Sequence, residues 1–411
     1  MNSILKIFLP SVTLLTVMAS AQPHYTVTDL KPLLGGNFSQ AFSVNNTGVS
    51  GGQSNLTDAT QRAVVWAKGS TSPILIGAGG VNSAIFGVNE NGQAEVQSEL
   101  AESDPNNSNF CGYGTDRKCV PFRWQGGALT ALPLLGGNNG AVGGINSRGE
   151  ISGWAETATL DPACAAPQKL DFEAVVWGPG VGEMRRLRPL SGDTVSMSIW
   201  INDAGQAVGT SGSCADTGLL PIGHGAHPVL WDKNGTPLNI GALDPTHEFG
   251  GIALSINNKG QVVGAANQQD GSFRPFLWSA AGGARILQLL PGAVGGGASA
   301  INDNGDAIGQ SFDADGFPSP VLWRNGGAPQ NLNDLAPGSS LYLIWPTTIN
   351  ARGDVSGFGI TAEGDVHGFV ATLTSAPLSR AGYSVIEETR SASIPENVRT
   401  MVKSRFGVNP R

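Results

Sequence analysis

The chain has 411 residues, of which 14% are charged, 40% are hydrophobic and 58 are glycine. A low fraction of charged residues together with this apolar fraction is compatible with a large hydrophobic core, and the many glycines are typical of an all-β protein with many turns. Residues 22–377 carry a net charge of −12, which argues against nucleic acid and anionic lipid as partners.

The first 21 residues are typical of a secretory signal peptide. Lys6 precedes an apolar run from Ile7 to Met18, and Ala19-Ser20-Ala21 has the small-x-small pattern that signal peptidases prefer. We therefore expect a mature chain that begins at Gln22. No other stretch is long and apolar enough for a transmembrane helix, so we expect a secreted protein in the extracellular space, periplasm or cell envelope.

A tetrapeptide, Asn-x-x-Gly behind an isoleucine or valine, recurs seven times at intervals of 44 to 57 residues. The asparagines that begin the seven copies are Asn45, Asn89, Asn146, Asn202, Asn257, Asn302 and Asn350. Asparagine can accept backbone hydrogen bonds, and glycine tolerates the left-handed conformation, so each copy predicts a tight hairpin turn. A calcium loop is the alternative, but no copy offers the six or more oxygen ligands that calcium needs.

Four short β-branched or aromatic runs make up each repeat, which predicts four strands, a to d, with the asparagine turn between a and b. Strand c ends in tryptophan in six copies: Trp66, Trp124, Trp177, Trp231, Trp278 and Trp323. A ring at a fixed position in every repeat indicates packing between neighbouring sheets, and a platform for stacking sugars is the alternative.

Repeats of this length with four strands predict a single β-propeller, because one such sheet cannot bury both of its faces alone. The seventh repeat ends after its strand c near Leu373, and a matching strand d appears at Tyr25–Leu30. We therefore predict an all-β, seven-bladed propeller over residues 22–377, in which the N-terminal strand closes the last blade.

The four cysteines allow three pairings, of which we favour Cys111 with Cys119 and Cys164 with Cys214. The first two share one long b-to-c loop, and the other two lie in the b-to-c loops of adjacent repeats. A zinc site of four thiolates is the alternative, although no Cys-x2-Cys pair is present.

The longest insertions, Ser98–Val120, Glu156–Phe172 and Ser211–Ala226, are all b-to-c loops and so share one face of the propeller. We expect a ligand to bind on this face. The candidate ligand-face residues are Asp104, Tyr113, Asp116, Arg117, Asp161, Asp216 and Glu248. His224, His227 and His247 are weak candidates for a metal site, since loop histidines are usually solvated. We predict no cofactor and no catalytic residue.

Residues 378–411 form a basic tail with a net charge of +3. A capping box at Ser393 and Glu396 predicts a short helix through Phe406 that docks on the acidic body. A frayed terminus is the alternative.

The unit Ala-x-x-Ile-Asn-x-x-Gly-x-Val-x-Gly, followed by a strand ending in tryptophan, resembles the bacterial extracellular HAF repeats over about 350 of the 411 residues. The His-Ala-Phe triplet that names the family is replaced by related triplets, among them Arg274-Pro275-Phe276 and His367-Gly368-Phe369. The resemblance implies a secreted or envelope-associated repeat protein with no established activity.

Two hypotheses about function follow. The first is a monomeric, non-enzymatic module that recognises an extracellular glycan or envelope protein through its b-to-c loop face. The second is a carbohydrate-active enzyme, a polysaccharide lyase or hydrolase, on a propeller scaffold; nothing beyond analogy of fold supports it.

Overall fold

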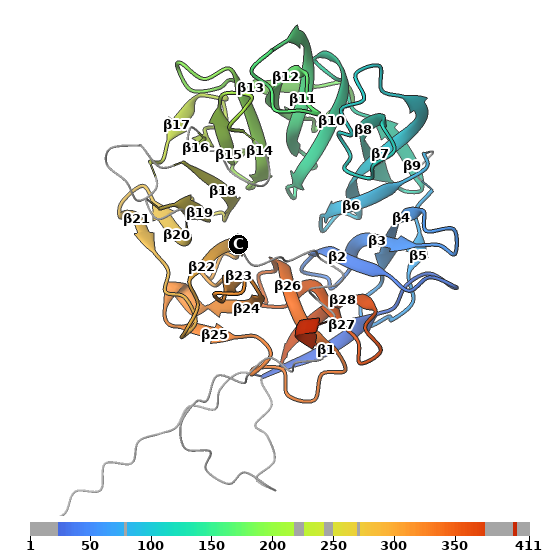
Figure 1. Ribbon diagram of the computed structural model, residues 1–411, viewed down its shortest axis with the longest axis vertical. Helices are drawn as coiled ribbons and strands as arrows, with labels where there is room; N and C mark the ends of the chain where they lie inside the picture. The colour runs from blue at the N-terminus through green and yellow to red at the C-terminus, as the bar shows by residue number, and fades with distance from the viewer. Residues whose placement is uncertain are drawn as a thin grey trace, which may run out of the picture.

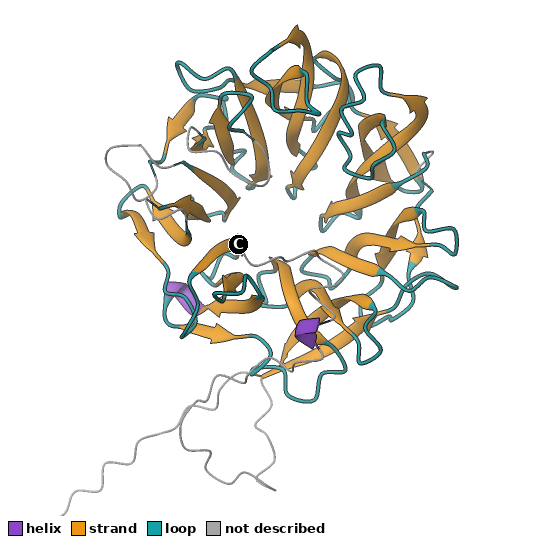
Figure 2. Ribbon diagram, in the orientation of Figure 1, coloured by secondary structure: helices purple, strands orange, loops and turns teal. Residues whose placement is uncertain are grey.

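The computed structural model describes residues 24–77, 80–217, 226–241, 250–268, 272–374 and 398–400. In these residues the chain forms seven four-stranded antiparallel sheets arranged as blades around a central axis (Figure 1), which confirms the predicted seven-bladed propeller. Figure 2 shows little helix beside the strands; the described helical segments are η1 (Arg324–Gly326) and residues 398–400. Within the described ranges, no helix is long and apolar enough to cross a membrane. The predicted signal peptide lies outside them.

The strands of each blade follow one another from the axis outward. Strands a, nearest the axis, are β2 (Ser39–Val44), β6 (Ser83–Val88), β10 (Gly136–Ile145), β14 (Val195–Ile201), β18 (Gly251–Ile256), β22 (Gly295–Ile301) and β26 (Tyr342–Ile349). Strands b are β3 (Ser50–Asn55), β7 (Gln93–Ser103), β11 (Ile151–Leu160), β15 (Ala207–Gly212), β19 (Val262–Asn267), β23 (Ala307–Phe312) and β27 (Val355–Ile360). Strands c are β4 (Gln61–Trp66), β8 (Arg117–Gln125), β12 (Leu170–Trp177), β16 (His227–Trp231), β20 (Phe273–Ser279), β24 (Pro318–Trp323) and β28 (Val366–Thr374). Strands d are β5 (Ile74–Leu75), β9 (Ala128–Ala131), β13 (Met184–Leu187), β17 (Pro237–Asn239), β21 (Gly283–Ile286), β25 (Pro329–Asn331) and, in blade 7, β1 (His24–Leu30).

The N-terminal strand closes the ring, as the sequence predicts. β1 pairs antiparallel with β28, from His24 opposite Thr374 to Leu30 opposite Gly368. The Tyr25 side chain is buried in the cluster between blades 6 and 7, and its hydroxyl donates to the Gly353 carbonyl oxygen at 3.1 Å. Strands from the two ends of the chain therefore share one sheet and one core.

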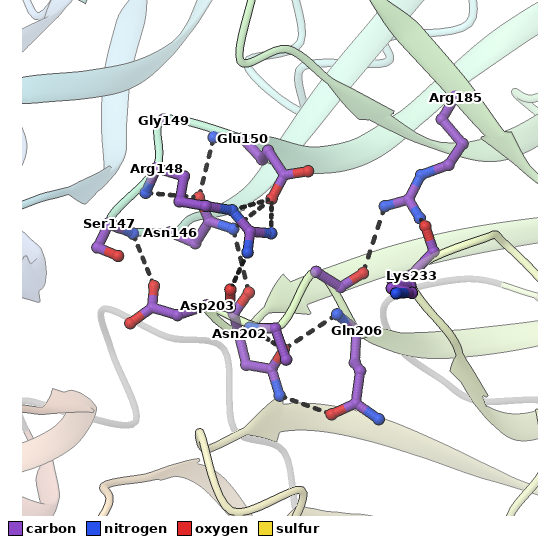
Figure 3. A network of polar contacts seen from close by, with 12 residues as sticks. Asn146, Ser147, Arg148, Gly149, Glu150, Arg185, Asn202, Asp203, Gln206 and Lys233 are labelled. Carbon is purple, nitrogen blue, oxygen red and sulfur yellow. Dashed lines mark hydrogen bonds and ion pairs between the residues drawn. The ribbon is translucent and has the colours of Figure 1, made fainter.

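The seven asparagine turns form a closed belt around the axis. Each asparagine Oδ1 accepts the backbone N–H groups two and four residues on, which is the predicted turn; for Asn202 the donors are Ala204 at 3.1 Å and Gln206 at 3.0 Å. Each Nδ2 also donates to the backbone carbonyl oxygen of the asparagine in the next blade, at 2.9 to 3.1 Å, and the last bond runs from Asn350 to Asn45. Figure 3 shows the link from Asn146 to Asn202. These bonds occupy the asparagine oxygens and favour the structural interpretation over a calcium loop.

The glycine at the fourth turn position has a φ of +72° to +88° in every copy, so the left-handed conformation expected of it is present seven times. Each strand a also carries one unpaired residue three positions before the asparagine, a β-bulge that bends the strand nearest the axis. In blades 1 and 2 the bulged residues Phe42 and Phe86 stack on each other, with ring centroids 4.9 Å apart.

The strand-c tryptophans pack between blades. Trp66, Trp177, Trp231 and Trp323 are fully buried, and each indole N–H donates to a backbone carbonyl just after strand d of the preceding blade, at 2.7 to 3.2 Å. Trp124 and Trp278 are half-buried in the same kind of cluster. The packing interpretation is confirmed for the four buried rings, since a buried ring cannot stack on a sugar.

Candidate functional site: the b-to-c loop face

The b-to-c insertions of blades 2 and 3 lengthen the strands that flank them, whereas β15 in blade 4 has 6 residues. Strands β7 and β11 have 11 and 10 residues, whereas β3, β19, β23 and β27 have 6 each, so the insertions extend the b–c hairpins beyond their sheets. We call residues 98–120, 156–172 and 211–217 the cap.

Two disulfides fix the cap, in the pairing that the sequence favours. Cys111–Cys119 closes the loop of blade 2, with its Cα atoms 5.3 Å apart. Cys164–Cys214 joins the loops of blades 3 and 4, with its Cα atoms 4.4 Å apart. Because all four cysteines are in disulfides, the four-thiolate zinc site is wrong. The disulfides indicate an oxidising environment.

A buried amide joins the loops of blades 2 and 3 at the base of the cap. Asn139, fully buried in β10, donates through Nδ2 to Asp104 at 3.2 Å, to Ser108 at 3.1 Å and to Glu156 at 2.9 Å. Its Oδ1 accepts the backbone N–H of Cys119 at 2.8 Å. A single side chain of the propeller wall thus orders both loops.

The two carboxyl groups at Asn139 are structural. Asp104 is predicted as a ligand-face residue, but it is only 1% exposed, and its oxygens accept bonds from the backbone of Asn106 and Ser108. Burial opposes the ionisation of Asp104, but these hydrogen bonds outweigh it and lower its pKa. Burial raises the pKa of Glu156 despite its bonds to Gln168 and Asn139. Asp104 therefore holds the loop and does not face a ligand.

Three further predicted residues lie in the loop of blade 2. Tyr113 is half-buried and donates from its hydroxyl to Gln53 Oε1 of blade 1 at 3.1 Å; burial raises its pKa. Arg117 donates to the Ala101 carbonyl oxygen and so crosses its own hairpin. Asp116 is exposed and has a φ of +51°, so of these three residues it is the most accessible to a partner.

Asp161 lies in the loop of blade 3 beside a second carboxyl group. Its Oδ1 accepts the Ala163 N–H at 2.8 Å, which fixes the turn that leads to Cys164. Burial, a hydrogen bond to Asp161 and the charge of Asp161 raise the pKa of Asp171 to about 6. One oxygen of Asp161 and one of Asp171 lie within 4.8 Å of each other. Glycosidases separate their two carboxyl groups by about 5 Å or more, so this pair does not match their spacing.

The remaining candidates are only partly covered by the structure. Asp216 Oδ2 accepts the Ser213 hydroxyl at 2.7 Å and so caps the turn after Cys214. His227 Nδ1 lies 3.1 Å from Asp193 Oδ2, which also accepts the Ser211 hydroxyl at 2.6 Å. His224, His247 and Glu248 lie outside the described residues, so the three-histidine metal site stays an untested prediction.

The tip of the cap is apolar and exposed. Leu160 is 70% exposed, and the chain beyond it turns through small apolar residues. The exposed members are Pro162, Ala163, Ala165, Ala166 and Pro167. Phe110 and Trp154 lie half-buried below, with ring centroids 6.4 Å apart and planes tilted by 45°. The cap thus presents an apolar surface on a rigid base.

At the opposite end of the axis the belt encloses a cup of about 200 Å³. Its wall holds the apolar residues that precede the asparagines, and Glu90, Asp203 and Asp303 stand at its rim. Each of these carboxylates accepts the backbone N–H of the corresponding residue in the preceding blade, at 2.8 to 2.9 Å. The rim acids therefore reinforce the belt.

Blade 2 departs from the repeat beside this cup. Glu95 takes the place that Val208 and Val263 hold in blades 4 and 5. Its carboxyl is fully buried and has no hydrogen-bond partner among the residues that the structure describes. A Cβ at Gly87, in the cup wall, would lie 2.5 Å from Glu95 Oε1. Burial raises the pKa of Glu95 well above its ordinary value.

Sequence reasoning missed the side chains that organise the cap, namely Ser108, Asn139, Glu156 and Gln168. Their partners come from loops far apart in the chain, so no local pattern marks them. The signal available was the asparagine at position 139, inside a strand that is otherwise rich in glycine and small apolar residues.

The fold and the loops define a class: a seven-bladed β-propeller, closed by its N-terminal strand, with one elaborated face. No protein-family model matches the chain, and no curated protein matches it in sequence. Among solved structures, a prolyl endopeptidase analysed for inter-domain dynamics is 8% identical, with a TM-score of 0.51 over 87% of this chain and 51% of its own. A puromycin hydrolase is 11% identical, with a TM-score of 0.50 over 82% of this chain and 54% of its own.

An acylaminoacyl peptidase from Pyrococcus horikoshii is 12% identical, with a TM-score of 0.48 over 80% of this chain and 52% of its own. The chain spans about half the length of these three structures. At such low identity the likeness to the prolyl endopeptidase and the puromycin hydrolase shows the propeller fold alone.

Proposed function

We propose that this chain is an exported, non-enzymatic binding propeller whose cap recognises an extracellular protein. The observation that carries the proposal is the apolar tip around Leu160, held by a disulfide and exposed on the elaborated face. Exposed apolar surface on an ordered base is typical of protein interfaces, because its burial is favourable and little ordering opposes it.

A glycan is the second candidate partner, and the Phe110–Trp154 pair favours it. Sugars stack on aromatic faces, and these two half-buried rings lie on the cap, for Phe110, and directly before it in β11, for Trp154. The carbohydrate-active enzyme stays an alternative, but the Asp161–Asp171 pair gives it no support. Kinship with HAF repeats is likewise a hypothesis that rests on the repeat pattern.

The test measures binding of the labelled protein to cell envelopes of the host organism, with and without protease treatment of the envelopes. For a protein partner we expect protease to abolish binding and Leu160→Asp/Ala163→Asp to weaken it at least tenfold. Leu34→Asp is the matched control, because Leu34 is 99% exposed and lies outside the cap.

Binding that survives protease and is lost in Trp154→Ala would instead identify a glycan. If Leu160→Asp/Ala163→Asp and Trp154→Ala both bind like the wild type, the cap is not the binding surface and the proposal is wrong.

A further inference from the structure

A second site lies on the same face, on the other side of the ring from the cap. Residues 398–400 form a helical turn beside β26, β27 and β28 (Figure 1), within the helix predicted for the basic tail. They contact the b-to-c loop of blade 6 and, in blade 7, the first half of β26 and the end of β27. We call the contacted residues, Asp313, Asp315, Phe317, Ile344 and Ile360, the tail seat.

The apolar part of the seat receives one valine. Val398 is 7% exposed and packs with Phe317, Ile344 and Ile360, which are themselves 0 to 1% exposed. Tyr342 and Trp345 are partly buried against the same cluster. The position accepts an apolar side chain, because a polar one would lose its hydration there without a partner.

The acidic part of the seat receives the next residue. Arg399 donates to Asp313 Oδ2 at 2.6 Å and to Asp315 Oδ2 at 3.2 Å. Its guanidinium also lies over the Phe317 ring, 5.3 Å from the centroid. Two carboxylates with an aromatic face select a planar cation, which arginine provides and lysine does not.

The seat is ordered by the propeller itself. Asp313 Oδ1 accepts the backbone N–H groups of Asp315 and Phe317 at 3.0 and 2.9 Å, so its other oxygen is left to receive the guanidinium. Trp345 stacks on Phe358, with centroids 6.3 Å apart and planes within 3°. A site formed before its ligand arrives loses less entropy on binding.

We propose that the tail seat is a peptide-binding site for an apolar residue followed by arginine, and that the chain's own residues 398 and 399 occupy it as an intramolecular ligand. The contact is small, and its ion pairs are partly open to solvent, with Arg399 at 23% and Asp315 at 57% side-chain exposure. A matching peptide can therefore displace the tail. Because the tail belongs to the same chain, it competes at a high effective concentration and hides the site.

The test uses the full chain and a fluorescent peptide with the sequence of residues 393–406, followed by anisotropy. Val398→Asp/Arg399→Glu in the protein releases the tail. We expect this variant to bind the peptide about tenfold tighter than the wild type does, because the tail, whose effective concentration is in the millimolar range, no longer competes. A peptide that carries Arg399→Glu should not bind.

Adding Asp313→Asn/Asp315→Asn to the released variant should abolish peptide binding, because asparagine keeps the turn but removes the charges. Asp58→Asn is the control, since Asp58 caps the equivalent loop of blade 1 through Thr60. Thermal melting confirms that each variant folds. If releasing the tail gives no tighter binding, or if the Asp313 and Asp315 substitutions leave binding unchanged, the proposal is overturned.

Discussion

At the a-to-b turns all seven blades repeat one asparagine with the same contacts, whereas the b-to-c loops of blades 2, 3 and 4 differ from one another in length and contacts. The turns cannot vary independently, because each asparagine bonds both its own turn and the next blade. The long loops are free of that constraint and are held by disulfides and by Asn139. The difference separates the part of the molecule that closes the ring from the part open to a binding role.

The largest expected effect concerns the cap. Cys164→Ser/Cys214→Ser should lower the free energy of unfolding by about 4 kcal/mol, because the disulfide closes a loop with a sequence separation of 50. Cys111→Ser/Cys119→Ser, with a separation of 8, should cost about 2.5 kcal/mol. Urea denaturation measures both. If both double substitutions lower the free energy of unfolding equally, the Cys164–Cys214 disulfide contributes no extra stability by joining two blades.

The next effect concerns the belt. Asn202→Ala removes two bonds accepted by Oδ1 and two donated by Nδ2, to Asn257 and Gln206. We expect a loss of about 3 kcal/mol, at roughly 1 kcal/mol for each bond and with some compensation by water. Asp232→Ala provides the control, because Asp232 Oδ1 accepts the equivalent two backbone N–H groups within its own c-to-d turn. Its free energy of unfolding should fall by much less than that of Asn202→Ala. A similar loss of unfolding free energy in both variants would show that the bonds between blades add no stability beyond that of an ordinary turn.

The smallest effect is a gain. Glu95→Val restores the residue type of blades 4 and 5 at a buried position and should stabilise the fold by about 2 kcal/mol at pH 7. Because burial raises the folded-state pKa of Glu95 above the unfolded value near 4.3, the native state binds more protons and wild-type stability falls as pH rises above that value.

The gain from Glu95→Val should therefore grow with pH, as denaturation midpoints from pH 4 to 8 would show. Glu95→Gln separates charge from packing, since it removes the ionisation and keeps the size. A gain that does not change with pH would mean that Glu95 finds a partner after all.

The fold could be predicted from the repeat because each motif that identifies a blade lies within a short stretch of sequence. The turn asparagine and glycine, the tryptophan of strand c and the N-terminal strand d can each be recognised within a few residues. The bond from Asn146 to the Asn202 carbonyl could not be recognised, since it depends on the distance between blades.

The candidate site was predicted less well, for a related reason. The disulfide pairing followed from which loops are neighbours, and it was right. Asp104 was predicted to face a ligand because a carboxylate in a long loop is usually exposed to solvent. Only the positions of Asn139 and Ser108, which both bond its carboxylate, show that it is buried. The tail seat depends on Phe317 and Ile360, which belong to different blades and share no motif.

The pairing of β1 with β28 has a consequence for the order of synthesis. The strand made first finds its partner only when the last strand has been made, so no shorter chain that ends before β28 can complete blade 7. Until then six blades stack with two open ends, and the buried face of Tyr25 is exposed to water. The ring is therefore assembled after translation has passed residue 374, and β1 must be kept from pairing elsewhere until that moment.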